Sequence, residues 1–175
     1  MQNIVVIGAG QAGSALTAKL RALGYEGELT LIGAEPEPPY QRPPLSKAYL
    51  LGKLEKERLY LRPRAFYDDQ RITLLTGSEV TEIDSAAQVI HVAGRDIAYD
   101  ALALTTGSRP KTLPAAIGGD LDGIFTMRSM ADADAVAPRL QEGAKLVIVG
   151  GGYIGLEAAA VAASQGLDVT LVETA

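Results

Sequence analysis

An apolar run followed by a glycine turn opens the chain: Ile4-Val5-Val6-Ile7-Gly8-Ala9-Gly10-Gln11-Ala12-Gly13. The run is typical of a buried strand, and residues 14–23 after the turn are typical of a helix. We expect Gly8 to allow a sharp exit from the strand, Gly10 to let a pyrophosphate approach the backbone, and Gly13 to let the helix pack closely against the strand. The N–H groups at the helix start would then face the pyrophosphate, so the spacing indicates a dinucleotide-binding βαβ unit.

The same pattern occurs a second time, at Leu146-Val147-Ile148-Val149-Gly150-Gly151-Gly152-Tyr153-Ile154-Gly155. Both helical segments stop at a glycine, Gly24 and Gly166, as helix C-termini often do. A further apolar strand follows each helix, at residues 29–32 and 169–172. Two unrelated glycine turns in one α/β domain are the alternative, but the recurrence of strand, turn, helix and strand in one order favours a repeated unit.

An acidic residue follows the second copy, at Glu173, where a carboxylate can bind both ribose hydroxyls of a dinucleotide. Gly33 falls at the equivalent position of the first copy, and Ala34 and Glu35 come next. We therefore expect Glu173 to bind a ribose in the second copy. Glu35 is the nearest candidate in the first.

Composition places the chain among globular proteins, with 47% apolar and 21% charged residues in 175. The net charge of −5 argues against general nucleic-acid affinity. No apolar run approaches the roughly 20 residues that a membrane helix requires. The N-terminal apolar run is the first strand and lacks a basic leader, so we expect a cytoplasmic protein with no membrane association.

The chain has no cysteine and one histidine, His91. The lack of cysteine excludes disulfides, cysteine-ligated clusters and a redox-active dithiol within this chain. One histidine and no cysteine offer too few nitrogen and sulfur ligands for a typical protein metal site, and we expect none. His91 alternates with apolar residues in a predicted strand, which favours an ordinary, partly exposed histidine.

A proline-rich loop over residues 36–47 follows the first βαβ unit. Prolines fix the backbone angle φ and restrict the preceding residue, which predicts a stiff, extended segment. A rigid connector is one interpretation. The other is a lining of the cofactor crevice, because the loop leaves the carboxyl end of a nucleotide-binding strand and would deliver Arg42 and Lys47 there.

The centre of the chain predicts further strands and short helices. A buried strand at 101–104 runs into Thr106-Gly107, which would touch a cofactor if the strand ends join the other cofactor-side loops; a plain turn is the alternative. The remaining predicted elements are helices at 45–51, 63–70 and 131–140, a strand at 71–75, and an antiparallel meander of strands at 79–84, 88–92 and 95–99.

These elements together predict an α/β fold: a Rossmann-like parallel sheet with helices on both faces, and a three-stranded antiparallel meander. Residues 110–125 contain several Pro and Gly and suggest a crossing between domains. The second Rossmann unit is incomplete, because only one βαβ repeat follows residue 143. Its strand edge and sheet faces would need to be covered.

Four segments of the chain, in order, resemble the flavin-dependent pyridine-nucleotide oxidoreductases, in particular the ferredoxin-reductase branch that includes putidaredoxin and rubredoxin reductases. The segments are Gly8-Ala9-Gly10-Gln11-Ala12-Gly13, Tyr40-Gln41-Arg42-Pro43-Pro44-Leu45-Ser46-Lys47, Leu104-Thr105-Thr106-Gly107-Ser108-Arg109-Pro110 and Gly150-Gly151-Gly152-Tyr153-Ile154-Gly155-Leu156-Glu157. The resemblance implies a reductase that passes electrons from NADH, or less readily NADPH, through FAD to an iron–sulfur protein such as a ferredoxin or rubredoxin that feeds an oxygenase.

The resemblance also implies roles for single residues. Lys47 would lie by the flavin and pair with Glu157 near the nicotinamide; a solvated lysine is the alternative. Ala12, Val80 and Arg128 match flavin-contacting positions, whereas the family often has Asp where this chain has Ala34. The expected catalytic residues are Lys47 and Glu157, and the expected cofactor-binding residues are Gly8, Gly10, Gln11, Ala12, Gly13, Ala34, Glu35, Arg42, Pro43, Lys47, Val80, Thr106, Gly107, Arg128, Gly150, Gly152, Tyr153, Ile154, Gly155, Glu157 and Glu173.

Members of the family are longer, which implies that this chain is an N-terminal portion. We expect the first part of an FAD-binding domain at 1–112, a crossing at 113–142 and the start of an NAD(P)H-binding domain at 143–175. Exposed apolar sheet faces in 145–175 would favour self-association. Two alternatives remain open: a catalytically inactive dinucleotide-binding fragment, and a cofactor-free α/β domain that binds a partner.

Overall fold

The computed structural model describes residues 3–174 and divides into two compact units. The first unit runs to Gln41 and resumes over Tyr60–Ser108; the second comprises Arg42–Leu59 and the chain from Arg109 onward. The domain boundaries expected from the sequence stay a prediction, and these units differ from them by grouping residues 42–59 with the later part of the chain. Each unit is described by itself.

The first unit is built on a four-stranded parallel sheet in the order β3-β2-β1-β7. The strands are β1 (Asn3–Ile7), β2 (Glu28–Ile32), β3 (Thr73–Leu75) and β7 (Ala101–Leu104). Neighbouring side chains Val5 and Val6 point to opposite faces and are both fully buried. Both faces of β1 are therefore covered, which explains its continuous apolar run.

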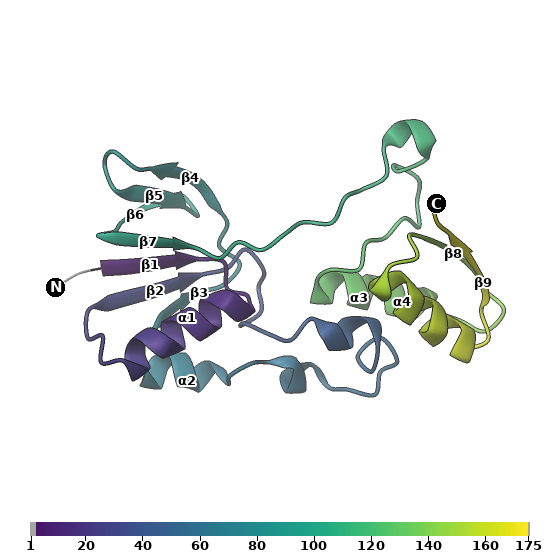
Figure 1. Cartoon of the computed structure of the whole chain (residues 1–175), viewed down its shortest axis with the longest axis horizontal. Helices are drawn as coiled ribbons and strands as arrows, with labels where there is room; N and C mark the ends of the chain where they lie inside the picture. Colours follow the sequence, from purple (N-terminus) through teal and green to yellow (C-terminus); the bar gives the residue numbers. More distant parts are fainter. Residues whose placement is uncertain (1–2, 175) are drawn as a thin grey trace. The chain divides into compact units, whose positions relative to one another are not determined.

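Helices cover one face of this sheet, where Val6, Leu29 and Leu31 form a buried cluster with Tyr67. The helices are α1 (Gln11–Ala22) and α2 (Arg64–Asp69), which lie together on that side of the sheet in Figure 1. The short α2 agrees with the helix predicted at 63–70. This layer carries the glycine turn, because α1 begins directly after β1.

The antiparallel meander covers the other face of the sheet (Figure 1). It consists of β4 (Val80–Asp84), β5 (Val89–Val92) and β6 (Arg95–Ala98), paired in that order. Ile90 and Val92 are alternate residues of β5, and they pack as one apolar stripe against Val5, Ile7 and Ile32. The α/β class, the parallel sheet and the meander are confirmed. The expected helices on both faces are wrong for this unit, because the meander and not a helix layer covers the second face of the parallel sheet.

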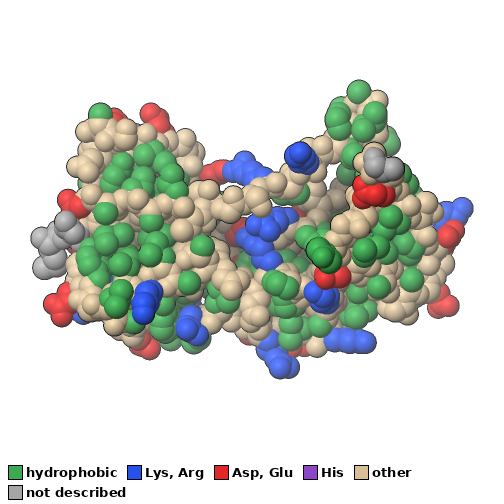
Figure 2. Space-filling view, viewed as in Figure 1, with side chains coloured by type: hydrophobic (Ala, Val, Ile, Leu, Met, Phe, Trp, Pro, Cys, Tyr) green, Lys and Arg blue, Asp and Glu red, His purple; other side chains and the backbone are tan. Residues whose placement is uncertain are grey.

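The second unit holds the repeat of the βαβ pattern: β8 (Lys145–Val149), α4 (Tyr153–Ser164) and β9 (Asp168–Val172). Within the described residues, β8 and β9 form a parallel sheet of two strands, as expected for an incomplete Rossmann unit. Figure 2 shows hydrophobic side chains at the surface over α4 and over the turn η3 (Ala115–Ile117). No helix within 3–174 has the length and apolar character to cross a membrane.

Two predicted helices of the second unit differ from the expectation, and in one of them proline gives the reason. The helix expected at 45–51 is a 3-10 helix, η1 (Pro43–Ser46), with its two prolines in the first turn, followed by turns. The helix expected at 131–140 is α3 (Met130–Val136), which gives way at Pro138 to a 3-10 turn, η4 (Ala137–Arg139). A further 3-10 turn, η2 (Lys56–Leu59), ends the inserted segment.

The two glycine turns have the same backbone geometry. Gly8 and Gly150 both have φ +110°, a conformation that favours glycine. A Cβ added at Gly13 would lie 2.2 Å from the carbonyl oxygen of Gly8, and one added at Gly155 would lie 2.0 Å from that of Gly150. The structure thus confirms the sharp strand exit expected of Gly8 and the close helix packing expected of Gly13.

We expect Gly13→Ala to lower the free energy of unfolding of the first unit. Overpacking costs about 1–3 kcal/mol, against the roughly 1 kcal/mol that alanine gains over glycine in a helix, and here the new methyl meets backbone that cannot turn aside. The measurement is the urea midpoint followed by circular dichroism. Gly10→Ala is the matched control, because nothing lies within 4 Å of its added Cβ. Equal midpoints for the two variants would contradict the packing argument.

Candidate functional site

The first glycine turn presents an open helix start. The N-cap of α1 is Gly10, with extended backbone at φ −94° and ψ −164°, and no side chain caps the helix or places an acid in its first turn. Gln11 and Ala12, the next residues, are exposed, and a Cβ at Gly10 would meet nothing within 4 Å. Backbone N–H groups and the helix dipole are therefore available to an anion such as a pyrophosphate.

The loop after β7 lies against this turn. The Thr105 N–H donates to the Ile7 carbonyl at 2.7 Å, and the Thr105 hydroxyl donates to the Gly8 carbonyl at 2.8 Å. A Cβ at Gly8 would be 2.8 Å from the Thr106 backbone nitrogen. The end of β7 therefore lies beside the first glycine turn, and Gly107, at φ +70°, follows Thr106 in the chain. A cofactor contact by Thr106 or Gly107 stays a prediction.

The position equivalent to Glu173 has no room for a side chain in the first unit. A Cβ at Gly33 would lie 2.6 Å from the Ala9 Cβ. Glu35, two residues later, accepts a hydrogen bond from the Tyr40 hydroxyl at 2.5 Å, and Tyr40 is only 5% exposed. Glu35 is thus held at the carboxyl end of β2 after the exposed Ala34. Ribose binding by Glu35, or a contact by Ala34, stays a prediction.

Val80 packs within the first unit. Its side chain is half-buried and lies against the apolar cluster formed between the parallel sheet and the meander. This position gives Val80 a structural role in the core, and its flavin contact stays a prediction.

The second glycine turn repeats the open helix start. The N-cap of α4 is Gly152, at φ −68° and ψ 176°, without a side-chain cap, and nothing lies within 4 Å of a Cβ added there. Tyr153 and Ile154 follow and are 89% and 50% exposed. Glu173 accepts hydrogen bonds from the backbone N–H groups of Gly151 and Thr174, which lower the pKa of its carboxyl, Gly151 most. An ionised acid therefore stands beside this turn, as expected for a ribose site.

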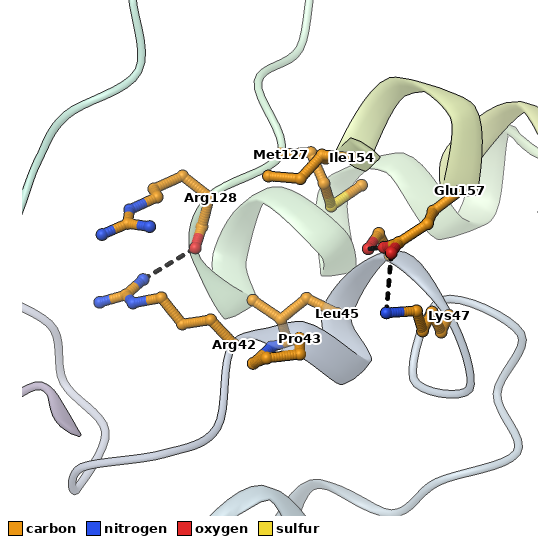
Figure 3. A pocket seen from close by; sticks show the side chains of 9 residues that line it. Arg42, Pro43, Leu45, Lys47, Met127, Arg128, Ile154 and Glu157 are labelled. Carbon is orange, nitrogen blue, oxygen red and sulfur yellow. Dashed lines mark hydrogen bonds and ion pairs between the residues drawn. The ribbon is translucent and has the colours of Figure 1, made fainter. Parts of the chain in front are cut away.

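A cavity of about 250 Å³ lies in the second unit, between η1, the segment before α3, and the start of α4 (Figure 3). Six of the predicted site residues line it: Arg42, Pro43, Lys47, Arg128, Ile154 and Glu157. Its other lining residues are Leu45, Ser46 and Met127, which we had not singled out as site residues. The available signal for Leu45 and Ser46 was their place in the same eight-residue segment as Lys47, and for Met127 its place next to Arg128.

Glu157 has a separate partner for each carboxylate oxygen. Lys47 Nζ is 2.8 Å from Oε1, and the Ser46 hydroxyl donates to Oε2 at 2.6 Å. The Lys47 bond first, and the Ser46 bond second, lower the pKa of Glu157. The predicted pairing of Lys47 with Glu157 is therefore present, and Glu157 shares a face of α4 with Ile154, three residues earlier. A catalytic role for the pair stays a prediction.

Arg42 and Arg128 also line the cavity, and Figure 3 shows their guanidinium groups away from this ion pair. Arg42 donates to the Arg128 carbonyl at 2.8 Å. The Asp132 carboxylate accepts the Arg128 and Ser129 N–H groups at 2.8 and 2.9 Å, as part of the capping box that starts α3. The Arg128 backbone is therefore held by these bonds, and two guanidinium groups lining one cavity suit an anionic ligand.

The described residues do not form a metal-binding cluster. Among residues 3–174, no group of three or more His, Asp or Glu side chains is arranged to hold a metal ion. The chemistry that the described geometry can offer is anion binding at two helix starts and an ion pair within a cavity.

This chain belongs to the pyridine nucleotide-disulphide oxidoreductase family, whose model matches residues 2–175. It is 46% identical over 172 residues to a rhodocoxin reductase of Rhodococcus erythropolis, covering 98% of this chain and 40% of the relative. It is 45% identical over 176 residues to a putidaredoxin reductase of Pseudomonas putida, covering 99% of this chain and 42% of the relative. The chain thus spans about two-fifths of the length of the curated relatives that it matches.

Comparison with solved structures gives the same family. A covalent complex of putidaredoxin reductase with putidaredoxin matches with a TM-score of 0.91 and 43% identity, over 97% of this chain and 42% of that one. The Rossmann-like class expected from the two glycine turns is therefore confirmed.

We expect Lys47→Met to raise the pKa of Glu157. Methionine keeps most of the side-chain length but removes the charge that favours the carboxylate. Because the folded-state pKa lies below its ordinary value, the pair stabilises the fold above that value, and the contribution is lost as the pH falls through the folded-state pKa. The measurement is a carbon-13 NMR titration of the Glu157 carboxyl. Lys53→Met, an exposed lysine outside the cavity lining, is the control; a similar shift in both variants would contradict a local ion-pair effect.

Proposed function

We propose that these residues belong to a flavoprotein reductase that passes electrons from NAD(P)H through FAD to an iron–sulfur protein, a ferredoxin or rubredoxin that feeds an oxygenase. The observation that carries the proposal is the pair of glycine turns with one geometry, each with an open second glycine and an uncapped helix start, in a chain of this family. Rhodocoxin and putidaredoxin reductases as relatives support the iron–sulfur partner. A cytosolic location is part of the proposal.

The first turn is proposed to bind FAD. Gly10 leaves space for the pyrophosphate, the N–H groups at the start of α1 donate to it, and Thr106 lies beside the turn. Glu35 would accept the adenosine ribose hydroxyls from its position at the end of β2. The residues present fit the group, since the cradle is one that a larger side chain at Gly10 would fill.

The second turn is proposed to bind NADH in preference to NADPH. Gly152 leaves the matching space, and Glu173 would accept the two ribose hydroxyls. Its ionised carboxylate would repel a 2′-phosphate, which disfavours NADPH. Support for this assignment comes from the hydrogen bond of Gly151 to Glu173, which holds the acid at the turn.

The cavity of the second unit is proposed to adjoin the reacting rings. Bound FAD would supply the conversion of a two-electron input into one-electron outputs. The protein's own residues would orient the ligand: Lys47 and Glu157 place paired charges at the cavity, and Ile154 and Met127 would contribute apolar surface to its lining. Arg42 and Arg128 would hold an anionic portion of the cofactor.

A crossed pair of variants tests both nucleotide sites. We expect Gly10→Val to weaken the response of residues 8–13 to FAD about tenfold or more, because a branched side chain would enter the pyrophosphate path and each 1.4 kcal/mol is a factor of ten. Gly152→Val should instead weaken the response of residues 150–155 to NADH. The measurement is amide NMR titration of the full chain, which also detects weak binding.

Each variant is the control for the other, since both glycines have extended backbone and open surroundings. An unchanged FAD response in Gly10→Val would remove the first turn from the site. If wild type responded to neither nucleotide, neither turn would be a nucleotide site of this chain, which is what the cofactor-free alternative expects. If it bound both but showed no NADH-driven flavin reduction, the inactive-fragment alternative would hold for this chain.

We also propose that this chain self-associates through the open face of β8 and β9. Ile148 faces α4, 3.4 Å from a Cβ added at Gly155, so by alternation Val147 and Val149 face away from it; each is 62% exposed. Contiguous exposed apolar residues on a sheet face favour association.

We expect Val149→Lys to reduce self-association, because a charge on this face opposes apolar contact. The measurement is light scattering of the chain over a range of concentrations. Ala163→Lys, an exposed position on α4, adds the same charge away from this face and should leave association unchanged. A wild-type chain that stays monomeric at every concentration would show that the exposed face is not sufficient.

A further inference from the structure

Two adjacent residues hold one carboxylate in the cavity of the second unit. Lys47 approaches Glu157 Oε1 at 2.8 Å, and the Ser46 hydroxyl donates to Oε2 at 2.6 Å. The bonds are not redundant, because each fixes a different oxygen. Two points of attachment define the plane of the carboxylate, whereas one leaves rotation about the side-chain bonds.

The two partners of Glu157 differ in mobility. Ser46 is only 4% exposed and has one side-chain torsion, whereas 51% of the Lys47 side chain is exposed. Holding a long lysine in one conformation costs more side-chain entropy than holding a serine. The Ser46 contact is therefore the fixed one and the Lys47 contact the one that opens first.

The backbone keeps Ser46 in place. It ends η1, whose first turn contains Pro43 and Pro44, and the N–H groups of Lys47 and Tyr49 both donate to the Pro44 carbonyl at 3.0 Å. Leu45, the preceding residue, is 2% exposed. A proline-stiffened turn with a buried apolar anchor thus directs the Ser46 hydroxyl at α4.

We propose that Ser46 is a positioning residue that keeps the Glu157 carboxylate turned toward the cavity whether or not Lys47 is paired with it. The functional meaning rests on the proposed function, in which this cavity adjoins the reacting rings. Lys47 can then swing to a ligand without releasing Glu157, so one charge of the pair is movable and the other is fixed.

The arginines that line the cavity do not hold the Glu157 carboxylate in place of Ser46. The charged side chains that line the cavity with Glu157 are Lys47, Arg42 and Arg128. Arg42 bonds to the Arg128 carbonyl, and Figure 3 shows both guanidinium groups away from the carboxylate. When Lys47 moves, the Ser46 O–H is the donor that stays on Glu157 among the described residues 3–174, and donation to an ionised oxygen is among the stronger hydrogen bonds.

The test is carbon-13 NMR of Glu157 in the full chain without cofactor, in wild type, Ser46→Ala, Lys47→Met and the double variant. We expect Ser46→Ala to raise the Glu157 pKa in both backgrounds and to collapse the shift difference between its methylene protons, a sign of a freely rotating side chain. Lys47→Met alone should raise the pKa but keep the methylene difference. Ser46→Cys, which keeps the volume with a weaker donor, should lie between wild type and Ser46→Ala.

An unchanged Glu157 pKa and methylene difference on adding Ser46→Ala or Ser46→Cys to Lys47→Met would overturn the proposal. A merely structural serine would lower stability without moving either signal. The result is independent of nucleotide binding, so a failed FAD titration would refute the proposed function and leave this inference standing. The reverse outcome would leave the function standing and remove the role of Ser46.

Discussion

The close approach of a helix to a strand exit is the constraint on which the site geometry depends. At both turns the third glycine lies so near the carbonyl oxygen of the first that any Cβ would overlap it, at 2.2 Å for Gly13 and 2.0 Å for Gly155. This contact brings the start of each helix to the end of its strand. The uncapped N–H groups then face the space left by Gly10 and Gly152. Without this close contact, the helix start would not be held facing that space.

The strands and the glycine turns could be predicted from local sequence patterns. The features that could not be predicted depend on contacts between residues far apart in the sequence. The strand at 101–104 was predicted with its observed bounds, because its apolar run and its flanks are local signals. The meander was found, but its packing against the sheet depends on the pairing of distant apolar faces. Ser46 was missed as a partner of Glu157 because the two lie 111 residues apart. The spacing of apolar and polar residues within either segment gives no information on a contact between the two segments.

Electrostatics in the second unit are organised locally despite the overall charge of −5. The cavity lining includes two arginines, of which Arg42 donates to the Arg128 carbonyl, and a lysine paired with a carboxylate. The Asp132 carboxylate accepts hydrogen bonds from the backbone N–H groups of Arg128 and Ser129. It therefore holds the backbone at Arg128, although Asp132 is not among the residues that line the cavity. Net charge therefore describes the solution behaviour of the chain, while the potential within the cavity is set by a few fixed groups.

The two copies of the glycine turn also exchange a large and a small residue. In the first, Ala9 faces Gly33; in the second, Gly151 faces Glu173. A side chain at position 33 would place its Cβ 2.6 Å from the Ala9 Cβ, so it would require either a backbone shift or a residue 9 without a methyl group. Substitutions at positions 9 and 33 are therefore expected to be coupled, and their effects on stability should not be additive.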